Sequence, residues 1–240
     1  CSLLYNGLIA PVEGYTARGF LWYQGESNRQ TADRYAEQME RMVSFWREQW
    51  QAPEMPFYYV MIPSYFYCNS YKDTTLPLFV ECQERAMNLI PNSGMAATTD
   101  LGEATCLHPA KKFEIGERLA ALAMAQTYGC KGFEAKAPQY ESHEIKDDGK
   151  VKIKMKNAPQ GLAPWSNVPV KGFELAGEDR KFHKAEARVW GSVVTVWCKE
   201  VPKPVAVRYA FHNVCGEVNL KNLYGVPAIP FRTDNWNDVK

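Results

Sequence analysis

In the first half of the chain, short apolar runs alternate with stripes of apolar residues at helical spacing. Apolar runs at 20–23, 57–62 and 94–99 predict buried strands. Apolar residues three and four positions apart predict helices over 31–50, 76–90 and 111–128. Because strands and helices alternate, we expect a parallel sheet covered by helices on both faces.

The pattern changes near residue 135 to a period of two. Val151, Ile153 and Met155 alternate with lysines, and further apolar runs at 193–197 and 205–211 are separated by turn-forming residues. This pattern is typical of antiparallel strands joined by tight turns. We therefore expect two regions, an α/β region at 1–135 and a small antiparallel β region at 136–240.

Composition narrows the function classes. The 240 residues carry a formal net charge of +1, which gives no argument for a nucleic-acid partner. No run of 18 apolar residues occurs, so we expect no membrane span. The chain starts at Cys1 without a charged-then-apolar signal segment, so we expect a processed product, a domain or a fragment.

No cofactor site is expected from the motifs. The seven cysteines are widely spaced and contain no C-x-x-C pair, which disfavours a zinc knuckle or a thioredoxin-type motif. The sequence has no metal-ligand set with convincing spacing and no glycine-rich phosphate loop. We therefore expect neither a metal nor a cofactor, while the disulfide state stays open.

A polar cluster follows the first predicted strand directly. It comprises Gln24, Gly25, Glu26, Ser27 and Asn28. In open α/β sheets ligands bind at the carboxyl ends of the strands, so this cluster is a candidate active-site segment. A second interpretation is that Ser27 or Asn28 caps the helix that follows.

A candidate general base lies at the same predicted edge. His108 belongs to the loop at 100–109, which follows the third predicted strand. A histidine there suits a general base for a hydroxyl nucleophile, and Asp100 or Glu103 could orient its ring. The alternative is an ordinary surface histidine. The other three histidines are expected to be structural or superficial: His143, His183 and His212.

Three consecutive aromatic residues, Tyr65, Phe66 and Tyr67, occupy the loop after the second predicted strand. They cannot all face a core, so we expect them to form a rim that contacts substrate.

Several of these motifs together resemble the sialate O-acetylesterases, within the SGNH hydrolase class. The resemblance covers essentially the whole chain and rests on the segments 4–11, 19–28, 91–96, 100–102, 108–109, 205–211 and 225–234. It implies a flavodoxin-like three-layer α/β/α core, partial in this chain, followed by the antiparallel β unit.

The resemblance also implies roles for residues. His108 corresponds to the general base and Gln24 to an oxyanion donor, with Glu26 and Asn28 supporting the loop. The class usually has Asp three residues before the histidine, where this chain has Thr105. Asp100, Glu103 or a backbone carbonyl would then have to orient His108.

The nucleophile is the main departure from the family pattern. The family serine lies in a Gly-Gln-Ser-Asn block upstream of the segment that resembles residues 4–11, and this sequence has no such block. We therefore expect the serine to come from a missing amino-terminal half or from another chain. Ser27 is the alternative nucleophile.

The implied function is hydrolysis of O-acetyl esters, chiefly of sialic acid, through a Ser-His acyl-enzyme route. An acetyl-xylan-type esterase, a non-catalytic carbohydrate-binding module and a structural remnant stay open as alternatives. The implied partner is an O-acetylated glycan. Family resemblance places the protein outside the cell, in the periplasm or in lysosomes.

Overall fold

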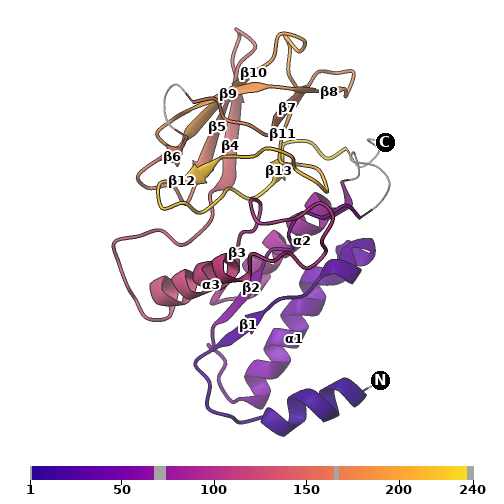
Figure 1. The fold of residues 1–240 in the computed structure, drawn as a ribbon, viewed down its shortest axis with the longest axis vertical. Coiled ribbons are helices and arrows are strands. Elements are labelled where there is room, and N and C mark those ends of the chain that lie inside the picture. Colours follow the sequence, from indigo (N-terminus) through magenta and orange to yellow (C-terminus); the bar gives the residue numbers. More distant parts are fainter. Residues whose placement is uncertain (1, 68–73, 165–167, 237–240) are drawn as a thin grey trace.

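The computed structural model describes residues 2–67, 74–164 and 168–236. Two units lie one above the other along the long axis of the molecule, a helical unit with a parallel sheet and an antiparallel β unit (Figure 1). The chain passes between them in the connection from α3 (Lys112–Gln126) to β4 (Gln139–Ile145), which contains the predicted boundary at residue 135. The predicted fold class is confirmed.

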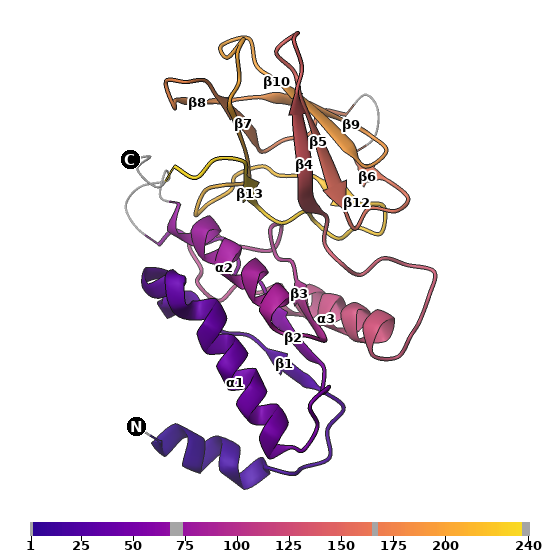
Figure 2. The ribbon, with the colours of Figure 1, turned by 180° about the vertical axis from the view of Figure 1, so that it is seen from behind.

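The parallel sheet lies between two layers of helices. Its strands, in the order β1-β2-β3, are β1 (Phe20–Trp22), β2 (Phe57–Val60) and β3 (Ser93–Ala96). Side chains of β2 alternate: Phe57 and Tyr59 pack against α1 (Tyr35–Gln49) and α2 (Thr75–Leu89), whereas Tyr58 and Val60 pack against α3. Figure 2 shows α1 and α2 on the near side of the sheet, and Figure 1 shows α3 on the other side. A central parallel strand buried on both faces explains the continuous apolar run.

The first predicted helix has two parts. Residues Glu26–Arg34 form the 3₁₀ segment η3, and the regular helix α1 begins only at Tyr35. The predicted stripe is buried at Tyr35, Met39 and Val43. Two short helical turns near the amino terminus, η1 (Tyr5–Ile9) and η2 (Ala10–Val12), precede the sheet.

The end of α3 also follows the prediction. Gly129 has φ +69°, and the Cys130 N–H donates to the Met124 carbonyl at 2.9 Å. A left-handed glycine with this long-range bond is a common way to end a helix.

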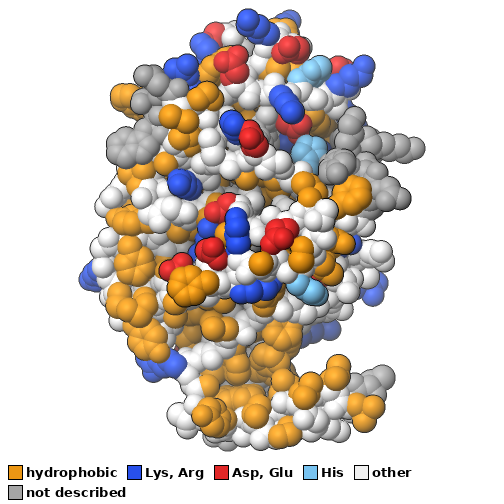
Figure 3. All heavy atoms as spheres, viewed as in Figure 1, with side chains coloured by type: hydrophobic (Ala, Val, Ile, Leu, Met, Phe, Trp, Pro, Cys, Tyr) orange, Lys and Arg blue, Asp and Glu red, His pale blue; other side chains and the backbone are white. Residues whose placement is uncertain are grey.

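The prediction of a buried first strand is wrong in one respect. β1 forms as expected, but Leu21 is 64% exposed. β1 lies at the edge of the sheet and pairs only with β2 within the described part of the chain. On one face Phe20 contacts Trp46 and Trp50, with ring centroids 5.2 Å apart in each case, whereas the opposite face is left open. In Figure 3, hydrophobic side chains predominate at the lower end of the molecule, whereas charged side chains lie over its middle and upper parts.

The second half folds into packed antiparallel sheets, as the period-two pattern predicts. One sheet has the order β4-β5-β10-β9, a second has the order β13-β11-β7-β8, and a short pair is β12-β6. The remaining strands are β5 (Val151–Lys156), β6 (Leu162–Ala163), β7 (Phe173–Ala176), β8 (Phe182–Lys184), β9 (Glu186–Trp190), β10 (Val193–Trp197), β11 (Ala206–Tyr209), β12 (Lys221–Asn222) and β13 (Phe231–Arg232). In β5 the apolar residues are buried and the lysines are exposed. The inner faces of the two larger sheets share one core.

Several polar contacts join the two units. Arg232 of β13 forms a bidentate ion pair with Glu81 of α2, at 2.7 and 3.0 Å. The Thr99 hydroxyl donates to the Ala228 carbonyl at 2.8 Å. Gln139 donates to Glu84 at 2.5 Å, and burial raises the pKa of that carboxyl. These contacts hold α2 and the loop after β3 against the β unit.

Within the described ranges, no helix has both the length and the hydropathy needed to cross a membrane. The cysteines at 82, 106, 130, 198 and 215 are free thiols.

Candidate active site

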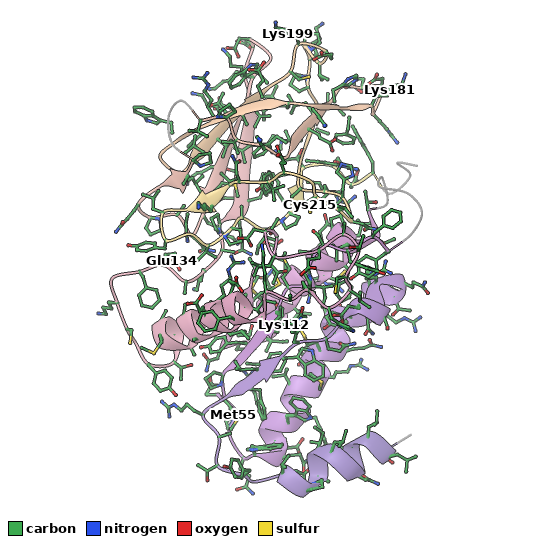
Figure 4. All side chains as sticks on the ribbon, in the orientation of Figure 1. Met55, Lys112, Glu134, Lys181, Lys199 and Cys215 are labelled. Carbon is green, nitrogen blue, oxygen red and sulfur yellow. The ribbon has the colours of Figure 1, made fainter. Side chains whose placement is uncertain are left out.

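Three loops meet at the carboxyl edge of the parallel sheet. They follow β1, β2 and β3, and they contain the polar cluster at 24–28, the aromatic residues at 65–67 and the His108 loop. The Thr98 hydroxyl donates to the Met61 carbonyl at 2.7 Å, which joins the second and third loops. In Figure 4, Lys112 lies nearer the β unit than Met55, which precedes β2, so this edge faces the β unit.

The segment after β1 is held by its own amides. Gln24 Nε2 donates to Asn28 Oδ1 at 2.7 Å, and the Tyr35 hydroxyl donates to the Gln24 carbonyl at 3.0 Å. Burial raises the pKa of Tyr35 to about 12, so this hydroxyl stays a donor at neutral pH. The Gln24 amide has a second N–H, which is the donor an oxyanion would need.

Gly25 is required at the turn between β1 and η3. Its φ is +149°, and a Cβ there would lie 2.7 Å from Phe79 Cζ and 3.1 Å from Ile62 Cγ1. The Gly25 N–H donates to Glu26 Oε2 at 3.1 Å. The glycine therefore lets the chain leave the strand directly over α2.

Neither Ser27 nor Asn28 caps the following helix. Gly25 is the residue at the cap position of η3, and no side-chain cap hydrogen bond is formed there. Asn28 accepts from Gln24 instead, and Ser27 is exposed. The capping interpretation is therefore wrong.

The aromatic loop is half-buried at all three positions. Arg29 lies over the Tyr67 ring at 3.4 Å from its centroid, and Tyr65 packs edge-on against Tyr67 at 4.9 Å. Burial raises the pKa of Tyr67, although Arg29 acts in the opposite direction. Tyr67 also packs against the core around α1 and α2. The substrate-rim role of Tyr65, Phe66 and Tyr67 stays a prediction.

His108 is exposed in the loop after β3. Its imidazole has no hydrogen-bond partner among the described residues, while its carbonyl accepts from the Cys106 thiol at 3.2 Å. Glu103 Oε1 accepts from the Ala110 N–H at 2.8 Å, which closes the loop around His108.

Asp100 pairs with an arginine that the sequence did not single out. Both of its oxygens accept from Arg118 of α3 at 2.7 Å. Arg118 also donates to the Ala97 carbonyl at 2.7 Å, so it fixes the start of the His108 loop. The orienting roles of Asp100 and Glu103 for the His108 ring stay predictions, and both carboxylates have other partners in this structure.

One contact links the first and third loops directly. Lys112, four residues after His108, donates to the Tyr23 hydroxyl at 3.2 Å and lies 4.5 Å from the centroid of its ring. Tyr23 immediately precedes Gln24. The polar cluster and the His108 loop are therefore neighbours at one edge of the sheet.

Two buried amides that position the loops were not found from the sequence. Gln83 of α2 accepts from the Ile62 N–H at 3.0 Å and donates to the Val60 carbonyl at 3.1 Å, which holds the end of β2. The side-chain Oδ1 of Asn213, in the β unit, accepts from the Leu76 N–H at 2.7 Å. The backbone carbonyl of Asn213 accepts from the Tyr65 N–H at 3.2 Å. Gln83 is a polar residue on the otherwise apolar, buried face of a predicted helix, and this could have identified it from the sequence.

Among the residues that the structure places, no group of three His, Cys, Asp or Glu side chains could hold a metal ion. The chemistry visible at this edge is that of amides, a histidine and carboxylates.

The chain is similar to proteins of the carbohydrate acetylesterase class. The chain superposes on a carbohydrate acetylesterase from Xanthomonas citri with a TM-score of 0.88 and 33% sequence identity, over 97% of this chain and 54% of that one. The sialate O-acetylesterase of Rattus norvegicus is 30% identical over 161 residues, which cover 60% of this chain and 30% of the rat protein. The human sialate O-acetylesterase is 29% identical over 161 residues, covering 60% of this chain and 31% of the human protein.

The family itself follows from a further match. The model of the family described as carbohydrate esterase, sialic acid-specific acetylesterase matches residues 3–125, so the chain belongs to this family. The match covers the parallel sheet, its helices and the loop with His108. The chain spans about half the length of the Xanthomonas citri protein. It matches less than a third of the length of the rat protein.

Proposed function

We propose that the protein contributes half of the active site of an esterase that removes O-acetyl groups from carbohydrates, sialic acid in the first place. The observation that carries the proposal is the meeting of the Gln24–Asn28 cluster and the His108 loop at one sheet edge, tied by the contact between Lys112 and Tyr23. Family membership supports the reaction class, and the names of the relatives support the substrate.

In the proposed reaction a serine hydroxyl attacks the acetyl carbonyl, and His108 accepts the hydroxyl proton. The sugar leaves as an alcohol after His108 returns that proton, and water then hydrolyses the acetyl-serine by the same route. The free N–H of Gln24 donates to the oxyanion, a contribution typically worth about 3 kcal/mol in the transition state. Asn28 holds the Gln24 amide in place.

We propose that the serine comes from a further polypeptide segment that lies against β1. β1 has an open edge and an exposed Leu21, and unpaired strand edges readily accept another strand. The Xanthomonas relative has about half of its length outside the matched part, which is enough chain to supply more strands. Ser27, exposed beside Gln24, is the alternative nucleophile.

The test is His108→Ala in the catalytically complete protein. Loss of a general base lowers turnover by about 10²–10⁴-fold, and added imidazole should restore part of it. His143→Ala is the matched control, because His143 is also exposed but bonds to Tyr140 in the β unit, at 2.7 Å. Wild-type turnover by His108→Ala would show that the base assignment is wrong.

The substrate is tested separately with that same protein. O-acetylated sialic acid should be hydrolysed with a higher kcat/KM than acetylated xylan oligomers. The reverse order would replace sialic acid by a plant-wall polysaccharide without changing the proposed mechanism.

A further inference from the structure

The outer face of the β4-β5-β10-β9 sheet carries two tryptophans, Trp190 of β9 and Trp197 of β10. Trp190 lies directly opposite Val193, and Trp197 follows Val193 by four residues on the same strand, so both point outward. Trp190 is 84% exposed and is the most exposed aromatic residue described. Trp197 is half-buried, so the two tryptophans together offer two apolar ring surfaces on one face of the sheet.

The separation of the two tryptophans follows from strand geometry. Four residues along a strand span about 14 Å, at about 3.4 Å per residue. An extended oligosaccharide crosses such a distance with a few sugar rings. The flat apolar face of a sugar ring packs on an aromatic ring, which gives each tryptophan a role.

Two cations occupy the space between the tryptophans. Thr195 lies between Arg188 of β9 and Lys152 of β5 in the register, so the three side chains form a row across the sheet. Within the described part of the chain neither Arg188 nor Lys152 forms a direct ion pair, although the charge of Lys152 helps to lower the pKa of Glu144. The neighbouring Lys154 differs, because it pairs with Glu141 at 3.1 Å.

Two carboxylates border this row. Glu144 lies opposite Lys152 in the register but forms its ion pair with Lys146, at 2.5 Å. Glu186 lies opposite Trp197, two residues before Arg188. The charge in the middle of the row is therefore positive, and it complements an anionic group held between two stacked rings.

We propose that this outer sheet face binds an acidic oligosaccharide. Two sugar rings stack on Trp190 and Trp197, and a carboxylate of the sugar lies against Arg188 and Lys152. The choice of carbohydrate as the ligand class rests on the proposed function, whereas the site is separate from the sheet edge with His108. It would hold an acidic glycan chain to the protein independently of ester hydrolysis.

The test uses the 240-residue chain and tryptophan fluorescence. An α2,8-linked tetramer of sialic acid should bind, with an affinity that falls as salt is raised. Maltotetraose, which has the same number of rings and no charge, should bind much more weakly. Trp190→Ala should weaken binding by about tenfold, because a stacked ring is lost.

Two variants test the charges. Arg188→Gln and Lys152→Gln should each weaken binding and reduce its salt dependence, whereas Lys181→Gln should change neither. Lys181 is an equally exposed cation at the far end of the β unit, as Figure 4 shows. All these side chains are exposed, so the melting temperatures should match that of the unaltered chain.

Several results would overturn the proposal. Equal binding of maltotetraose would show that the site does not select acidic oligosaccharides. Preference for an oligothymidylate would point to nucleic acid, and concentration-dependent dimerisation lost in Trp190→Ala would make a second copy the occupant. Because no turnover is measured, absence of esterase activity leaves this test unaffected.

Discussion

The two units of the molecule differ in how completely they cover their own apolar surface. Fifteen large hydrophobic side chains are exposed among the described residues, and eleven of them precede residue 135. The β unit encloses one core between its two larger sheets. The parallel sheet is enclosed at β2 but open at β1.

The two units therefore differ in how far their sheets are covered by the described residues. The β unit encloses most of its apolar side chains between its own sheets, and it contains the buried ion pair of Arg208 with Asp234. The α/β unit has an open strand, β1, next to the segment that we propose to carry the oxyanion donor. The proposed further segment would account for both the open edge of β1 and the lack of the family's Gly-Gln-Ser-Asn block in this sequence.

The largest effect is expected inside the closed unit. Arg208 and Asp234 form a buried bidentate pair at 2.9 and 2.7 Å, with side chains 4% and 2% exposed. Asp234→Asn leaves the Arg208 charge uncompensated and should lower the free energy of unfolding by about 3–5 kcal/mol. Urea unfolding followed by tryptophan fluorescence measures it.

The control for that variant is a surface pair of the same unit. Glu217→Gln breaks the exposed ion pair with Lys171 and should leave the urea midpoint unchanged. Equal midpoints for Asp234→Asn and the unaltered chain would mean that the β unit does not depend on its buried pair.

An effect of middle size is expected at the turn that builds the site. Gly25→Ala places a Cβ against Phe79 in a backbone conformation that alanine rarely adopts. The free energy of unfolding should fall by about 2–4 kcal/mol. Thermal and urea unfolding of the same variant measure the loss.

Gly116 provides the matched glycine. It lies in α3 with no atom within 4 Å of an added Cβ, so Gly116→Ala should stabilise the protein by about 0.5–1 kcal/mol. If both variants shifted stability in the same direction, close packing at Gly25 would not explain its presence.

The smallest effect on stability is expected at the open edge. Leu21→Lys replaces an exposed apolar side chain and should change the free energy of unfolding by less than about 0.5 kcal/mol. It should, however, reduce self-association of the chain in sedimentation at micromolar concentration, because a lysine on an edge strand disfavours pairing. Unchanged self-association of Leu21→Lys would mean that the chains associate through a surface other than β1.

The sequence predicted the positions of helices and strands better than how deeply each strand is buried. The alternation at Val151, Ile153 and Met155 identified an antiparallel strand, and the apolar run at 57–62 identified the central parallel strand. The run at 20–23 looked equally buried, because periodicity reports the side chains and not the number of neighbouring strands.

For the candidate site, the motifs identified the segments that meet at the sheet edge, but not the residues that hold those segments in place. Gln24 and His108 stand out by position and chemistry, and the sheet does bring their loops together. Arg118 and Asn213 act through contacts between residues far apart in the sequence, Asp100 with Arg118 and Leu76 with Asn213. Such pairings depend on the folded packing and leave no local pattern.

The most direct test of the central claim is turnover by the purified 240-residue chain on O-acetylated sialic acid, with and without Ser27→Ala. We expect turnover close to the uncatalysed rate in both, since the proposed nucleophilic serine belongs to a segment outside this sequence. Robust turnover that Ser27→Ala abolishes would contradict it and make Ser27 the nucleophile.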